Sequence, residues 1–152
     1  MTVDCSLSKL EFRLGNLMSL IQWLEFSRHG DSRGSLVAFN TDSPTPIPFP
    51  IKRVYYIYGT SAWASRGFHA HFDLRQVVTA VAGSCEMTLD TGLERSTVRL
   101  DSPNRGLFID KMVWREMHNF SKDCVLLVLA SAPYSPRDYL RNYQQFLSLA
   151  GS

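Results

Sequence analysis

Two histidines placed two positions apart form the clearest chemical motif in the sequence. His69 and His71 lie in the segment RGFHAH, and Arg66 precedes them across a glycine. In an extended backbone, residues two apart project from the same face, so their backbones would lie about 6.6 Å apart and their rings would point together. Imidazole is the side chain best suited to proton transfer near neutral pH. The motif predicts an acid/base pair, with rim or structural histidines as the alternative.

The same spacing can also bind a divalent metal ion, because His-x-His on a strand supplies two donors. Metal-binding double-stranded β-helix proteins place a carboxylate shortly after the second histidine, where this sequence has Arg75 or Gln76. Those proteins have a further ligand on a later strand. The residue that we align with it is Arg115, and Glu116 and His118 lie close to it in the sequence. A cation is a poor neighbour for a metal ion. The sequence therefore predicts no metal site.

Short runs of β-branched and aromatic residues surround the motif and are separated by turn signals. They recur at spacings of about ten residues, too short for the helical crossovers of a parallel sheet. We expect strands over 51–59, 75–82, 85–89, 96–100, 106–109, 114–120 and 124–131. Ser135 and Pro136 offer a helix cap and a first-turn proline, and the apolar residues from Tyr139 to Leu147 have helical spacing. The pattern predicts an all-β antiparallel sandwich or barrel with one C-terminal α-helix.

Composition limits the classes of protein to consider. The chain has 152 residues, 45% of them hydrophobic, and a formal net charge of +2. This charge disfavours a nucleic-acid binder, and no apolar stretch reaches the roughly 18–20 residues of a membrane span. Three cysteines without disulfide or metal spacing indicate a cytoplasmic location. We expect one domain over 18–152, preceded by an N-terminal extension over 1–17 that could be a mobile arm.

Several separated motifs resemble one enzyme family. They are RGFHAH, the openings GDSRGSLVAF and IKRVYYIYG, the stretch LDSPNRGLFIDKMVWREMHNFSKDCVLLVLAS, and DYLRNY near the carboxy end. Together they are similar to the dTDP-4-dehydro-6-deoxyglucose 3,4-ketoisomerases. The resemblance implies a cupin-type double-stranded β-helix, or jelly roll, that acts as a homodimer without a metal or organic cofactor. It also implies a dTDP-linked 4-keto-6-deoxyhexose as substrate, whose ketone moves to carbon 3 through an enediol on the route to deoxyamino sugars of surface glycans or antibiotics.

The resemblance assigns roles to particular residues. Carried over one by one, the catalytic group falls on His69, His71, Arg66 and Tyr55. Tyr56 and Tyr58 are close enough to Tyr55 to leave that register open. We expect His69 to remove the proton from carbon 3 and His71 to move protons between the two oxygens. Arg66 would hold the diphosphate or the enolate oxygen, while Tyr55 would donate a hydrogen bond.

A second group of residues is predicted to bind the substrate: Arg33, Lys52, Arg53, Trp114, Arg115 and His118. Basic side chains suit phosphate oxygens, and Trp114 can stack on the thymine ring. For each residue the alternative is a solvated surface cation or packing in the barrel. Two other functions remain open at this point: a metal-dependent cupin dioxygenase or isomerase, and a non-catalytic cupin that binds nucleotide sugars.

Overall fold

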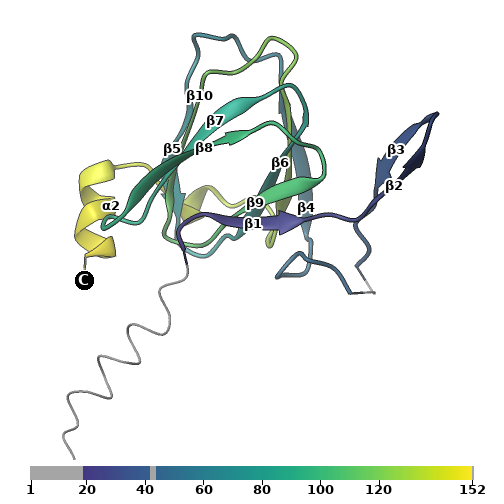
Figure 1. The fold of residues 1–152 in the computed structure, drawn as a ribbon. Helices are drawn as coiled ribbons and strands as arrows, with labels where there is room; N and C mark the ends of the chain where they lie inside the picture. Colours follow the sequence, from purple (N-terminus) through teal and green to yellow (C-terminus); the bar gives the residue numbers. More distant parts are fainter. Residues whose placement is uncertain (1–18, 42–43, 152) are drawn as a thin grey trace, which may run out of the picture.

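Antiparallel strands make up most of the computed structural model, which describes residues 19–41 and 44–151. Two five-stranded sheets face each other, and a short helix lies at the end of the chain (Figure 1). The all-β class and the single C-terminal helix are thus confirmed for the described residues. The predicted extension over 1–17 lies outside them.

The order of the strands is that of a jelly roll, in which neighbours in space are often distant in sequence. The first sheet contains, in spatial order, β1 (Gln22–Glu25), β9 (Arg105–Ile109), β6 (Gln76–Ala82), β11 (Val125–Ala130) and β4 (Arg53–Tyr58). The second contains β12 (Tyr139–Leu140), β5 (Arg66–His71), β10 (Trp114–His118), β7 (Cys85–Asp90) and β8 (Arg95–Leu100). A separate hairpin is formed by β2 (Arg28–Asp31) and β3 (Gly34–Val37). Of these strands, β1, β2, β3 and β12 were not predicted.

Alternate side chains of both sheets fill the space between them. Val78 of β6, Met87 and Leu89 of β7, and Leu126 of β11 belong to this main core and are almost fully buried. Burial of one such side chain stabilises the fold by about 1.5–3 kcal/mol. At one end of the barrel, the same inward-facing positions carry polar side chains instead, and these form the site described below.

The C-terminal helix begins later than the sequence predicted. Helix α2 spans Tyr143–Ala150, and the side chain of Asn142 caps it by accepting a hydrogen bond from the Gln145 amide at 2.9 Å. The segment Pro136–Asp138 forms a 3₁₀ turn, and Tyr139–Leu140 pair with β5 as strand β12. The prediction of a helix through Tyr139 was wrong because pairing with a distant strand overrode the local helical spacing.

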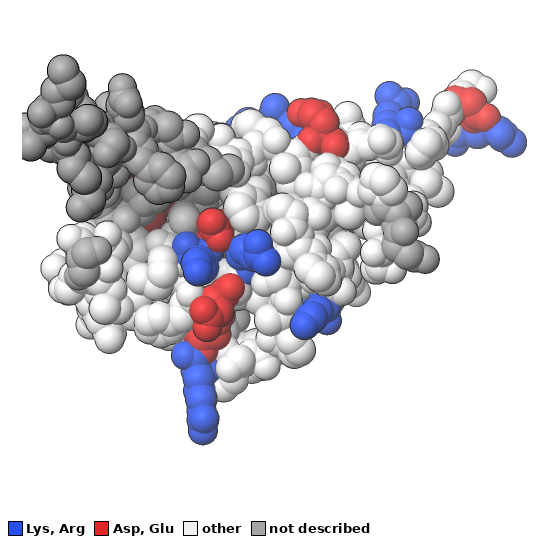
Figure 2. Space-filling model, turned by 90° about the horizontal axis from the view of Figure 1, so that it is seen from below, with Lys and Arg blue, Asp and Glu red and all other residues white. Residues whose placement is uncertain are grey.

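Charged side chains of both signs lie close together on the surface. Figure 2 shows Lys and Arg next to Asp and Glu on one face of the molecule, as a net charge of +2 implies. Asp101, for example, pairs with both Arg99 and Arg105. Within residues 19–41 and 44–151, no helix has the length and apolar character needed to cross a membrane.

Candidate active site

Strand β5 brings the two predicted histidines together. The ring centroids of His69 and His71 are 4.9 Å apart, with the rings nearly perpendicular. His71 is buried and His69 is half-buried. The pair lies toward the end of β5 that joins β12, because Tyr139 is the cross-strand partner of His71. The structure therefore supports the predicted convergence of the two rings.

A β-bulge precedes His69 and depends on a glycine. Gly67 has φ +91° and Phe68 has φ +56°, and the pairing with β10 skips Phe68. A Cβ on Gly67 would lie 2.7 Å from the Arg115 carbonyl oxygen, so a larger residue does not fit there. The extra residue shifts the alternation by one, which places Arg66, opposite Met117, on the same side of β5 as His69.

The hydrogen bonds of the two rings fix the same tautomer in each. Nδ1 of His69 lies 3.0 Å from the Gly67 carbonyl oxygen, and Nδ1 of His71 lies 3.0 Å from Oδ2 of Asp138. A carbonyl and a carboxylate can only accept, so each Nδ1 carries the hydrogen. The lone pair of each ring is then on Nε2, which is the arrangement a general base requires.

Burial keeps both rings neutral. Desolvation, followed by the positive charge of Arg115, lowers the pKa of His69 from 6.5 to about 4. The same two causes lower the pKa of His71 from 6.5 to about 2. Two neutral imidazoles at physiological pH can accept protons without first having to lose one.

These shifts predict a specific pH dependence. The unfolded chain takes up a proton on His69 as the pH falls through 6.5, whereas the folded chain does so only near 4. Stability is therefore lost as the pH falls from about 6.5 toward 4, while kcat/KM stays level over most of that range. Denaturant unfolding and initial rates measured across this range check both expectations. The exposed His29 offers a control, since His29→Ala should leave both profiles unchanged. An acidic limb of kcat/KM near 6.5 would contradict the expectation.

Arg115 is a buried cation without a partner in the described chain. It lies on β10 directly opposite His69, and only 2% of its surface is exposed. Its Nε, Nη1 and Nη2 atoms are buried and make no hydrogen bond. Desolvation lowers its pKa from 12.5 to about 10, so it remains charged at neutral pH. Since an unpaired buried charge is costly, this guanidinium is suited to an anionic group on a ligand.

Strand β4 contributes a tyrosine to the same end of the barrel. Its alternation turns Tyr55 inward and leaves Tyr56 and Tyr58 exposed, which favours Tyr55 among the three tyrosines. Tyr55 Oη accepts a hydrogen bond from Nε2 of Gln76 at 2.7 Å. Burial raises the pKa of Tyr55, so its hydroxyl stays protonated at neutral pH and can donate a hydrogen bond to a ligand. The guanidinium of Arg53 lies over the Tyr55 ring at 5.2 Å.

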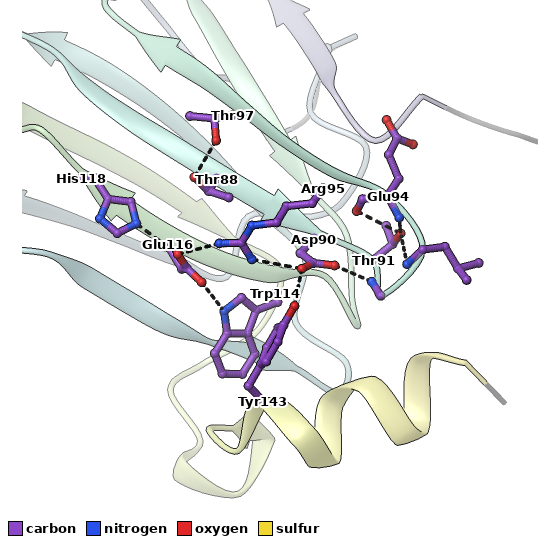
Figure 3. Close-up of polar contacts among 12 residues, drawn as sticks. Thr88, Asp90, Thr91, Glu94, Arg95, Thr97, Trp114, Glu116, His118 and Tyr143 are labelled. Carbon is purple, nitrogen blue, oxygen red and sulfur yellow. Dashed lines mark hydrogen bonds and ion pairs between the residues drawn. The ribbon is translucent and has the colours of Figure 1, made fainter.

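Trp114 and His118 lie on the other face of β10 from Arg115. Figure 3 shows both beside Glu116, which accepts from Trp114 Nε1 at 3.0 Å and lies 3.1 Å from His118 Nε2. Trp114 also packs against Tyr143 of helix α2, with ring centroids 5.0 Å apart. Because side chains alternate along a strand, these two residues cannot share the face that Arg115 presents to His69. The structure therefore does not bring them to the histidine pair.

The other predicted basic residues are spread over the molecule. Arg33 is at the tip of the β2–β3 hairpin, exposed, with an ion pair to Asp31. Lys52 is exposed, next to the inward Arg53, and Arg66 is exposed at the start of β5. Of these residues, Arg53 is the one that the described contacts tie to the site.

Sequence reasoning missed three residues around the histidines. The Tyr139 ring lies 4.9 Å from the His69 ring and 4.4 Å from the His71 ring, and the Arg141 guanidinium lies 4.3 Å above Tyr139. Asp138 contacts His71 directly. The motif DYLRNY was recognised in the sequence, but a helix was predicted there. Asp138 and Tyr139 were therefore not placed beside strand β5.

Replacing His118 with alanine tests the position of this residue on the outer face. We expect kcat within about twofold of the wild type and a stability loss of about 1 kcal/mol, because contacts to Glu116 and Ser65 are lost while the inner face is untouched. Steady-state rates and denaturant unfolding measure the two effects. A loss of kcat of tenfold or more would instead support the predicted role in substrate binding.

Comparisons with known proteins identify the family of the chain. Residues 19–151 match the family model described as FdtA, WxcM-like, C-terminal. The TDP-4-oxo-6-deoxy-α-D-glucose-3,4-oxoisomerase of Aneurinibacillus thermoaerophilus is 50% identical over 123 residues, covering 81% of this chain and 87% of the relative. A 3,4-ketoisomerase structure from Helicobacter canadensis aligns with a TM-score of 0.81 and 45% identity, covering 87% of this chain and 98% of the other.

A second similar structure contains a bound TDP-sugar. It is a histidine-to-asparagine variant of the 3,4-ketoisomerase QdtA from Thermoanaerobacterium thermosaccharolyticum, in complex with TDP-4-keto-6-deoxyglucose. It aligns with a TM-score of 0.83 and 37% identity, covering 88% of this chain and 96% of the other.

The jelly roll and the names of these relatives define a cupin-type sugar ketoisomerase. The family match spans most of the chain, and the relatives agree in their reaction class. The chain belongs to the FdtA-like family of sugar 3,4-ketoisomerases.

Proposed function

We propose that the protein moves the ketone of dTDP-4-keto-6-deoxyglucose from carbon 4 to carbon 3 and so supplies a 3-keto sugar for amination. The observation that carries this proposal is a neutral, convergent histidine pair facing an unpaired buried guanidinium. The names of the relatives support the substrate: one is a TDP-4-oxo-6-deoxyglucose oxoisomerase, and another was captured with TDP-4-keto-6-deoxyglucose.

The reaction needs only proton transfers. His69 Nε2 takes the proton from carbon 3, the electron pair left behind forms a C3=C4 double bond, and the carbon 4 ketone becomes an enediolate oxygen. His71 takes the proton of the carbon 3 hydroxyl and passes it to the oxygen on carbon 4. The carbon 3 oxygen then becomes the ketone as the double-bond pair takes up a proton at carbon 4, delivered by His69. Atoms and electrons balance without an oxidant or reductant.

The other residues of the site stabilise charge. The guanidinium of Arg115 opposite His69 is suited to the enediolate oxygen, since its three donors make no other hydrogen bond. The Tyr55 hydroxyl can donate a further hydrogen bond. Arg53 and Arg66 are the proposed diphosphate ligands, because arginine forks match phosphate oxygens.

Incubation with dTDP-4-keto-6-deoxyglucose in deuterated water tests the proposal. We expect a dTDP-3-keto-6-deoxyhexose by NMR, whose carbon 4 configuration can be read from the same spectra. Binding of dTDP without turnover would instead indicate a non-catalytic nucleotide-sugar protein. Dependence on a bound ion, tested by elemental analysis and chelation, would favour the metal-dependent alternative; among the described residues no three His, Cys, Asp or Glu side chains gather as a metal site.

A homodimer in the cytoplasm is also part of the proposal. The β2–β3 hairpin extends away from the barrel, on the side opposite to α2 (Figure 1), and its eight residues are almost all exposed. A lone hairpin is marginally stable, so a second copy is the partner that would cover it. The outer face of the first sheet also exposes Val54, Tyr56 and Tyr58, each more than half accessible. The free, buried thiols of Cys85 and Cys124 support a reducing compartment.

Light scattering tests the dimer. We expect twice the monomer mass for the wild type and at least tenfold weaker association for the double variant Tyr56→Glu/Tyr58→Glu, because two charges would be buried at the interface. Leu93→Glu, at an exposed turn residue between β7 and β8, is the matched control and should remain dimeric. A monomeric wild type would contradict the proposal.

The dimer also bears on Arg33, because the β2–β3 hairpin whose tip carries it extends away from the barrel and from strand β5 (Figure 1). If its predicted contact with substrate is made in the partner's site, co-expressed Arg33→Ala and His69→Asn chains will recover about a quarter of the activity, since half of the dimers are mixed and each has one intact site. No recovery from two folded, inactive variants would remove Arg33 from the proposed site.

A further inference from the structure

The carboxylate of Asp138 connects the C-terminal segment to the histidine pair. Its Oδ2 lies 3.0 Å from Nδ1 of His71 and accepts the Leu74 amide at 3.3 Å, while its Oδ1 accepts the Asp73 amide at 2.8 Å. The side chain is 17% exposed. Three donors from residues 71–74 therefore hold the carboxylate in one orientation against the ring.

The backbone around Asp138 is fixed to β5 as well. The Phe72 amide donates to the Asp138 carbonyl at 3.0 Å, and the next residue, Tyr139, pairs with His71 as strand β12. The Tyr139 ring then packs on the His71 ring at 4.4 Å. His71 is thus held by a carboxylate at Nδ1 and by the Tyr139 ring, which packs at 61° to the imidazole.

The two histidines differ in this respect. Nδ1 of His69 donates to the Gly67 carbonyl, a neutral acceptor, whereas Nδ1 of His71 donates to a carboxylate. Hydrogen bonds to an ionised acceptor are roughly twice as strong as neutral ones, and they favour the imidazolium that forms when the ring takes a proton. The carboxylate therefore offsets part of the cost of protonating His71, which burial and the cation Arg115 make high.

We propose that Asp138 is a positioning residue that holds His71 in the Nδ1–H tautomer and balances its charge while it moves the proton between the oxygens on carbons 3 and 4. This inference rests on the proposed function. It assigns to the DYLRNY motif a chemical task through its aspartate, in addition to closing the barrel.

The variant Asp138→Asn removes the charge and keeps the size of the side chain. Its amide can donate to Nδ1 of His71, which would move the ring hydrogen to Nε2 and remove the lone pair from the substrate side. We expect kcat for ketone transfer to fall by about 10²–10⁴, with KM within about threefold. Exchange of the carbon 3 hydrogen with deuterated solvent should continue, because His69 still forms the enediolate and returns deuterium to carbon 3.

Imidazole ¹⁵N NMR gives a readout that does not depend on turnover. We expect the Nδ1–H tautomer for His71 in the wild type, the Nε2–H tautomer in Asp138→Asn, and recovery of the Nδ1–H form with part of the activity in Asp138→Glu. Asp101→Asn, which removes a surface carboxylate paired with Arg99 and Arg105, should leave the rates unchanged.

Other results would overturn the inference. One is an Nε2–H tautomer of His71 in the wild type, which can be read even if the asparagine variant does not fold. Another is an asparagine variant with wild-type kcat, or one in which exchange and ketone transfer fall in equal proportion with the tautomer unchanged, as a merely structural role predicts. If the wild type itself shows no ketone transfer, the proposed function fails, while the NMR measurement still tests the Asp138–His71 contact.

Discussion

Replacing His69 with asparagine is expected to lower kcat by about a thousandfold and to abolish exchange of the carbon 3 hydrogen. The reason is that the base which starts the reaction is gone, and general-base catalysis of this kind contributes about 10²–10⁴ in rate. Asparagine is close to histidine in size, and its amide can still donate to the Gly67 carbonyl that now fixes the ring. The strand and its bulge should therefore persist, and KM should change little.

Rates, isotope exchange and a melting curve measure this variant together. The informative comparison is Asp138→Asn, in which exchange at carbon 3 is expected to survive while ketone transfer is lost. Near-normal turnover by a folded His69→Asn protein would show that another group removes the carbon 3 proton. Loss of ketone transfer with exchange intact would reverse the roles assigned to His69 and His71.

Arg115→Met is expected to lower kcat by about 10²–10³ and at the same time to stabilise the fold by about 1–4 kcal/mol. The guanidinium is almost fully buried and its three nitrogen atoms make no hydrogen bond, so the cost of burying its charge is offset only through space, by Asp138 among others. Replacing buried ionic groups by apolar side chains of similar volume is often stabilising by this amount. Loss of one donor to a developing oxyanion costs about 10²–10³ in kcat.

Opposite changes in activity and stability are the signature of a group retained for chemistry. Denaturant unfolding measures the change in stability of Arg115→Met, and steady-state rates measure the change in its kcat. Arg115→Lys keeps the charge without the planar fork, so its kcat should lie between those of the wild type and Arg115→Met. Loss of the cation should also raise the pKa of His69 and His71, since Arg115 helps to lower both. A variant that is less stable and equally active would show that Arg115 serves the fold.

The sequence predicted the strand pattern well because alternation is a local property. Strands β6, β7 and β11 begin and end within one residue of the predicted ranges. Strands β2 and β3 were missed because the hairpin is exposed along its length and shows no alternation of buried and exposed residues, and β1 is only four residues long. The helix was placed too early because the spacing from Tyr139 onward fits a helix, whereas the pairing of Tyr139 with His71 is made across a long sequence separation.

For the site, the sequence alone determined that two imidazoles lie on one face of one strand, because residues two apart in an extended chain must do so. Tertiary structure decided the rest: that Arg115 faces His69, that Trp114 and His118 face away, and that Asp138 binds His71. Those facts depend on the register between β5, β10 and β12, and on a bulge at Gly67 that shifts the alternation by one. Register is set by packing over the whole barrel, so no short segment of sequence contains it.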